Sequence, residues 1–122
     1  MNTHNAPNEI LYEPVNSRIR LYGVNRPLLN PNESPWCDNF VELLADNSYF
    51  NATAASIEAA SCLLALPGIL KLKVDNWRIV VILASVFDWS DVHEDIAKVL
   101  QIAYFEGRGI VVQEVKTLSA LN

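Results

Sequence analysis

Alternation of hydrophobic and polar positions predicts two β-hairpins and a final strand. The predicted strands are residues 10–15, 18–22, 70–74, 77–84 and 109–116. The fourth of these, residues 77–84, is nearly all apolar and rich in β-branched residues, so we expect it to be covered on both faces at the centre of the sheet. Pro14 cannot donate to a strand ladder, so the first strand should lie at an edge or break there.

A helical spacing of apolar residues predicts three helices. The first covers residues 35–46, the second begins near Asn51 or Thr53 and reaches Leu66, and the third covers residues 88–106. The second is rich in small residues and carries little charge, so we expect it to be largely covered, with Cys62 buried as a small apolar side chain. In the third, Ile102, Tyr104 and Phe105 add apolar surface beyond what one buried stripe requires.

The predicted order is hairpin, helix, helix, hairpin, helix, strand. We therefore expect an α+β (two-layer α/β) fold with a mainly antiparallel sheet of about five strands and three helices packed on one face. The final strand–helix–strand unit requires a right-handed crossover if its strands lie parallel in one sheet. Residues 1–8 are expected to form a flexible tail, and residues 9–122 a single domain, because 122 residues match the commonest domain size.

Charge and composition favour contact between proteins. The net charge of −5 argues against general binding to DNA or RNA. Between Pro27 and Leu70 there are several acids and no Lys or Arg, which predicts either a solvated acidic face or a docking site for a basic partner on the first two helices. Charged residues make up only 19% of the chain, below the roughly 25% of typical domains. Some apolar surface should therefore be covered in a homo-oligomer, most simply a dimer.

The sequence also predicts where the protein resides. The N-terminal residues lack the basic start and apolar run of a secretory signal. No apolar stretch reaches the 18 or more residues that a membrane span needs. We therefore expect a cytoplasmic protein that does not contact a membrane and whose cysteines are reduced.

Candidate catalytic chemistry centres on His93, because the other histidine, His4, lies in the predicted tail. Asp91, Glu94 and Asp95 should raise the pKa of His93, which favours either a solvated surface histidine or an enzyme that uses His93 with Asp91 or Asp95. Together with Asp88 these acids resemble the capping residues of a helix start. We predict neither a cofactor nor a metal site, since no Cys or His spacing is typical of zinc.

Candidate contact residues are aromatic or basic. In the second strand, Arg18, Arg20 and Tyr22 should share one face, opposite Ile19 and Leu21. If the two hairpins are neighbours, Lys71 and Lys73 would join the basic residues in a small positive patch; a solvated outer face of the sheet explains the same pattern. The candidate interface or ligand-binding residues are Trp36, Trp89, Arg18, Arg20, Tyr22, Tyr104 and Phe105.

These observations favour a non-catalytic binding module that acts by protein–protein contact. We expect a small accessory or inhibitory protein of a bacterium or phage that self-associates. The first alternative is a small-molecule-binding protein with a pocket between helices and sheet, lined by Tyr12, Tyr22, Trp36 and Tyr104. The second alternative is the enzyme that uses His93.

Overall fold

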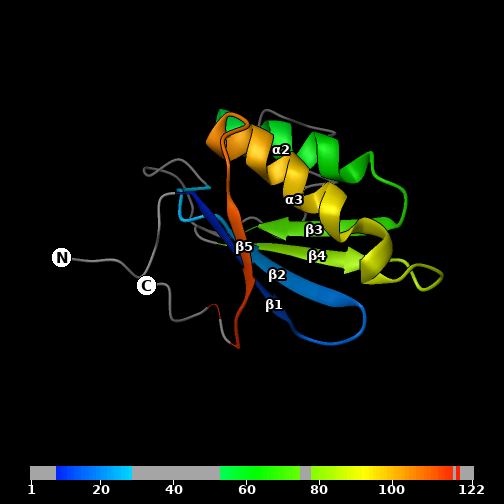
Figure 1. Cartoon of the computed structure of the whole chain (residues 1–122). Helices are drawn as coiled ribbons and strands as arrows, with labels where there is room; N and C mark the ends of the chain where they lie inside the picture. Colours follow the sequence, from blue (N-terminus) through cyan, green and yellow to red (C-terminus); the bar gives the residue numbers. More distant parts are fainter. Residues whose placement is uncertain (1–7, 29–52, 75–77, 117, 119–122) are drawn as a thin grey trace.

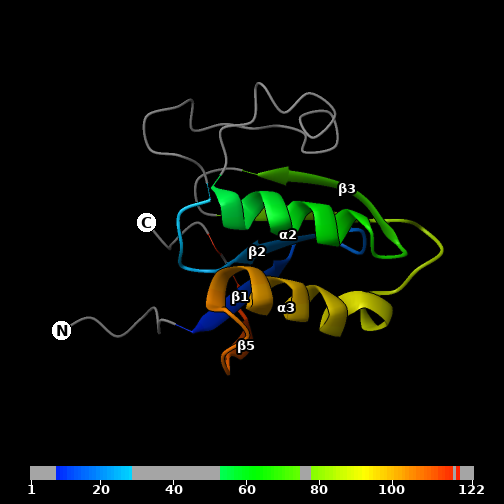
Figure 2. The same ribbon diagram turned by 90° about the horizontal axis from the view of Figure 1, so that it is seen from above.

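Five strands form one sheet in the computed structural model, which describes residues 8–28, 53–74, 78–116 and 118. In the order β3-β4-β2-β1-β5 across the sheet, the strands are β1 (Glu9–Pro14), β2 (Ile19–Gly23), β3 (Ile69–Val74), β4 (Ile79–Leu83) and β5 (Val111–Glu114). Two helices of the described ranges, α2 (Ala54–Leu64) and α3 (Trp89–Phe105), cover one face (Figure 1). Seen from above, they lie side by side over the sheet (Figure 2).

The sheet is mainly antiparallel, as the sequence predicts. β1 pairs with β2, β2 with β4 and β3 with β4 in antiparallel register, whereas β1 and β5 are parallel. It follows that β4 and β5 run in the same direction from non-adjacent positions in the sheet. The connection through α3 therefore crosses above β2 and β1, which places this helix over the first hairpin (Figure 1).

Of two strand predictions, one needs correction and one is confirmed. β4 is an internal strand with alternating buried and half-buried residues, but the central position belongs to β2. The apolar sequence of β4 is explained by the coverage of both its faces. That coverage does not determine the position of the strand in the order across the sheet. For the first strand, the second predicted alternative is correct: β1 lies inside the sheet, between β2 and β5, and it ends at Pro14.

Of the three predicted helices, two fall in the described ranges. The helix predicted at residues 35–46, which includes Trp36, lies outside them. Residues 1–7 of the predicted tail and Trp77 also lie outside the described ranges. α2 begins after the N-cap Thr53, whose side chain accepts from the Ser56 N–H at 3.3 Å. α3 ends at Phe105, and both its C-cap residue Glu106 and the following Gly107 have positive φ angles.

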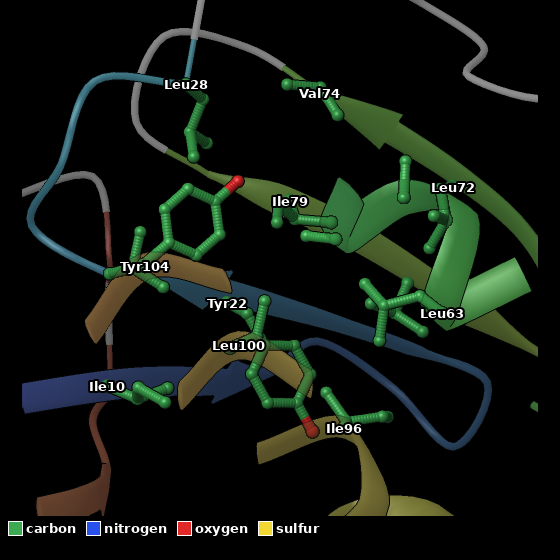
Figure 3. Close-up of a cluster of buried hydrophobic side chains, with 14 of the residues drawn as sticks. Ile10, Tyr22, Leu28, Leu63, Leu72, Val74, Ile79, Ile96, Leu100 and Tyr104 are labelled. Atoms are coloured by element: carbon green, nitrogen blue, oxygen red, sulfur yellow. The ribbon is translucent and has the colours of Figure 1, made fainter. Parts of the chain in front are cut away.

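The core lies between the sheet and the two helices (Figure 3). α2 buries Ser56, Ala59, Ala60 and Leu63, and α3 buries Val92, Ile96, Leu100, Tyr104 and Phe105. Both sets follow the spacing of a single helix face. Cys62 is exposed, contrary to the prediction, because its position lies off the α2 face that packs on the sheet.

A buried hydrogen bond joins the two helices. The hydroxyls of Ser56 and Tyr104 are 2.7 Å apart, and the Thr53 hydroxyl donates to Ser56 Oγ at 3.0 Å. Burial raises the pKa of Tyr104 well above its usual value of 10.0, so its hydroxyl remains protonated. The pair satisfies two polar groups that have no access to water.

We expect Ser56→Ala and Tyr104→Phe each to lower the free energy of unfolding by about 1–3 kcal/mol, since each removes a buried hydrogen bond. The double variant should lose less than the sum, because the second substitution removes a group that the first left without a partner. Urea unfolding of the four proteins measures this coupling. Strictly additive losses would show that the two hydroxyls do not depend on each other.

Candidate functional site

Five polar and aromatic side chains meet where α3 crosses the first hairpin. We call Tyr12, Arg20, Tyr22, Trp89 and His93 the Arg20 cluster. Tyr12 on β1 is the register partner of Tyr22 on β2, so their side chains point to the same face of the sheet. Arg20 is two residues from Tyr22 and shares that face. Trp89 and His93 are four residues apart on α3, so one helix face brings both to the sheet.

Arg20 is the centre of this cluster. Its Cζ atom lies 4.7 Å from the centroid of the Tyr12 ring and 4.7 Å from that of Trp89. Both distances are within the range of cation–π attraction, which is strongest for tryptophan. Arg20 Nη1 also donates to His93 Nδ1 at 3.2 Å and to the Tyr22 hydroxyl at 3.4 Å. The guanidinium thus connects β1, β2 and α3.

The aromatic rings of the cluster also contact one another. The Tyr12 and Tyr22 rings stack with centroids 5.7 Å apart, and the His93 ring lies 4.8 Å from Tyr12 at a tilted angle. Burial raises the pKa of Tyr22 above its usual 10.0, and the hydrogen bond and charge of Arg20 oppose that rise only in part. Tyr22 is therefore a neutral hydroxyl at physiological pH.

His93 is held neutral. A guanidinium can only donate hydrogen bonds, so His93 Nδ1 must accept and the ring proton resides on Nε2. Burial lowers the pKa of His93 below its usual 6.5, the charge of Arg20 lowers it further, and Glu94 acts in the opposite direction.

The expectation that nearby carboxylates raise the pKa of His93 holds for Glu94 alone, and the net direction is wrong because burial and the charge of Arg20 outweigh it. α3 turns His93 toward the sheet and leaves Asp91, Glu94 and Asp95 exposed. The Asp91 carboxylate instead accepts from the Asp88 N–H at 2.9 Å, within the capping box of the helix. Neither Asp91 nor Asp95 is brought to the imidazole, so the acid–base arrangement of the enzyme hypothesis is not assembled.

The other candidate residues separate into distinct places. Arg20, Tyr22 and Trp89 come together in the Arg20 cluster, whereas Tyr104 and Phe105 are buried in the core. Arg18 is exposed at the β1–β2 turn, and its Nε donates to the Leu83 carbonyl at 2.7 Å. Trp36 lies outside the described residues.

The positive patch is not formed. Arg20 is the register partner of Val81, and Lys73 that of Val80, so the two cations lie on opposite faces of the sheet. Arg20 faces the helices. The face of β2 that was predicted to be solvated is therefore the face that packs against the helices. His93 and Tyr12, absent from the predicted interface set, could have been included if the inner face of β2 had been identified.

Two further tests of the described residues are negative. No group of three or more His, Cys, Asp or Glu side chains within the described ranges has a geometry that could hold a metal ion. No helix in the same ranges is long and apolar enough to span a membrane.

The lowered pKa of His93 predicts that the protein loses stability as the pH falls. The unfolded chain binds a proton at His93 more readily than the folded chain, so this contribution is complete above the unfolded pKa of 6.5 and is lost as the pH falls from there through the lower pKa of the folded chain. His93→Asn keeps an acceptor for Arg20 but cannot be protonated. Unfolding with urea at about pH 7.5 and about pH 5.5 should show a smaller pH effect in the variant than in the parent. An equal effect would mean that His93 is not responsible.

Comparisons of the chain with known protein families, with curated proteins and with solved structures find no match.

Proposed function

We propose that this chain is a non-catalytic binding module that acts by protein–protein contact through one end of the sheet. This loop end consists of the β1–β2 turn, residues 15–18, and the β4–α3 connection, residues 84–88. The two loops extend from the same end of the sheet in both views (Figures 1 and 2). The Arg20 cluster adjoins them, since Trp89 begins α3 directly after the second loop.

The observation that carries the proposal is the exposure of apolar side chains at the loop end. Val86 is 86% exposed and Val15 is 49% exposed. Leu70, at the start of β3, is 56% exposed, and the preceding residue, Ile69, pairs with the last residue of β4. Single exposed apolar residues are ordinary, but a group at one end next to tryptophan and arginine has the composition of an interface centre.

Hydrogen bonds hold the loop end in place. Trp89 Nε1 donates to the Ser17 carbonyl at 3.0 Å, which fastens the turn to the start of α3. Leu83 N–H donates to the Arg18 carbonyl at 2.8 Å, and Ala84 N–H to the Gly68 carbonyl at 2.8 Å. A surface fixed before binding loses less conformational entropy on association, so these bonds support a role in recognition.

Gly68 allows the close packing beneath this surface. It has a φ of +95°, and a Cβ at this position would lie 2.8 Å from the Phe87 ring. Only glycine accommodates both the backbone conformation and the ring. Phe87 is therefore held against the start of β3, which leaves the neighbouring Val86 directed outward.

The partner in this proposal is a protein, and a second copy of the chain is included because of the low charged fraction of 19%. Val86→Asp would place a charge in the centre of the contact. We expect it to weaken binding at least about tenfold, as for a central interface residue. Ile102→Asp is the matched control: Ile102 is 53% exposed, and it lies about 20 Å along α3 from Trp89.

Light scattering measures self-association, and affinity capture from the native host followed by mass spectrometry measures other partners. Loss of the dimer in Val86→Asp alone identifies a second copy as the occupant. Loss of a captured protein in Val86→Asp alone identifies a different chain. If both variants behave like the parent in both measurements, the loop end is not a contact surface and the proposal fails. Urea unfolding should confirm that the two variants are folded.

A further inference from the structure

Arg20 carries a positive charge without a carboxylate partner among the described residues. Its Nη1 is used by His93 and Tyr22, both of which are neutral. Its Nε is buried and has no hydrogen-bond partner. No bond from Nη2 to a described residue is found either, so Nε and Nη2 both lack an acceptor among the described residues, and of the two only Nε is shielded from solvent. A buried donor without a partner is rare in folded proteins and calls for an explanation.

The two unused nitrogens form one geometric unit. In a guanidinium, the Nε–H bond and the nearest Nη2–H bond are parallel and point to the same side, away from Nη1. This side is the fork that binds both oxygens of a carboxylate in bidentate pairing. In Arg20 the contacts with Tyr22 and His93 occupy the opposite side and fix the plane of the group. The orientation of the Nε and Nη2 donors is thereby fixed, although neither has an acceptor among the described residues.

The surroundings stabilise the cation only in part. Tyr12 and Trp89 lie against the guanidinium, and cation–π contacts offset some of the loss of hydration. Aromatic rings do not satisfy an N–H that is directed past them. A hydrophobic residue at this position would avoid the penalty of the buried charge altogether. The arrangement is therefore more typical of a side chain that binds a ligand than of a structural ion pair.

We propose that Arg20 is the receptor for a single carboxylate, which its Nε and Nη2 bind side by side. A monoanion matches the site because only one cation is present and His93 adds no charge. A planar carboxylate also fits the fork better than a tetrahedral phosphate with two negative charges. This inference goes beyond the proposed protein contact, because a free carboxylic acid could occupy the site equally well.

Trp89 lies directly against the guanidinium that would bind the ligand. The ring lies over the guanidinium, is only half-buried, and is fastened by one exposed hydrogen bond to Ser17. Since Nε is shielded from solvent, a carboxylate can reach it only after a neighbouring group moves. The indole N–H of Trp89 therefore reports on binding.

Titration with sodium acetate, followed by proton–nitrogen NMR spectra of the full chain, tests the proposal. Sodium chloride at matched ionic strength is the reference for general salt effects. We expect the Arg20 Nε–H and Trp89 indole resonances to shift saturably with acetate and not with chloride. Arg20→Lys keeps the charge but loses the fork, so the affinity read from Trp89 should fall at least about tenfold.

Arg26→Lys is the matched control. Arg26 also lies over an aromatic ring, with its Cζ atom 4.6 Å from the Phe105 centroid, but its Nη1 donates to a backbone carbonyl at the far end of β2. Acetate affinity should be unchanged in this variant. If Arg20→Lys does not fold, the Arg20 Nε–H resonance of the parent protein still decides the question. An unsaturable shift, or equal affinity for inorganic phosphate, would overturn the assignment to a carboxylate.

A capped peptide with one Glu, compared with the same peptide carrying Gln, distinguishes the two sources of the carboxylate. Tighter binding of the Glu peptide than of acetate identifies a side chain of a protein partner. Tighter binding of acetate identifies a small carboxylic acid. Either result supports the receptor. Val86→Asp should leave acetate binding intact, so failure of the carboxylate site and failure of the loop-end contact can be told apart.

Discussion

The parallel pairing of β5 with β1 is the constraint on which the arrangement of this protein depends. β4 and β5 run in the same direction but are separated by β2 and β1, so the connecting helix has to pass over both strands. This path fixes which side chains of the first hairpin α3 covers. It also brings Trp89 and His93 to Arg20, because they lie on the face of α3 that meets the hairpin. Core packing and the candidate site thus share one topological cause.

The elements near this crossover could be predicted from local sequence patterns. Alternation in β2 correctly separates Ile19 and Leu21 from Arg20 and Tyr22, and the acidic start of α3 correctly marks a helix terminus. Neither signal says which face of β2 is inside. An arginine in the alternating pattern suggests that its face of β2 is exposed to solvent. The long-range pairing of β1 with β5 instead places α3 over that face. That pairing involves residues far apart in sequence, and no local pattern encodes it.

The same missing information explains the error in the pKa of His93. Its sequence neighbours are acidic and would raise the pKa, but a helix directs neighbouring residues to different faces. His93 turns inward to burial and the charge of Arg20, whereas Asp91 and Asp95 turn outward. The electrostatic environment of a helical residue is set by the surface on which the helix packs. For His93, that surface carries a cation supplied by a strand more than seventy positions earlier.

The position of β1 between β2 and β5 has a consequence for synthesis of the chain. Its hairpin partner β2 is translated immediately afterwards, but β5 follows about a hundred residues later, so the second pairing closes a very long loop. Until then β1 presents an unpaired edge with the donors and acceptors that other strands can join. Pro14 shortens that edge by ending it. A nascent or truncated form that lacks β5 is accordingly more prone to aggregate than the full chain.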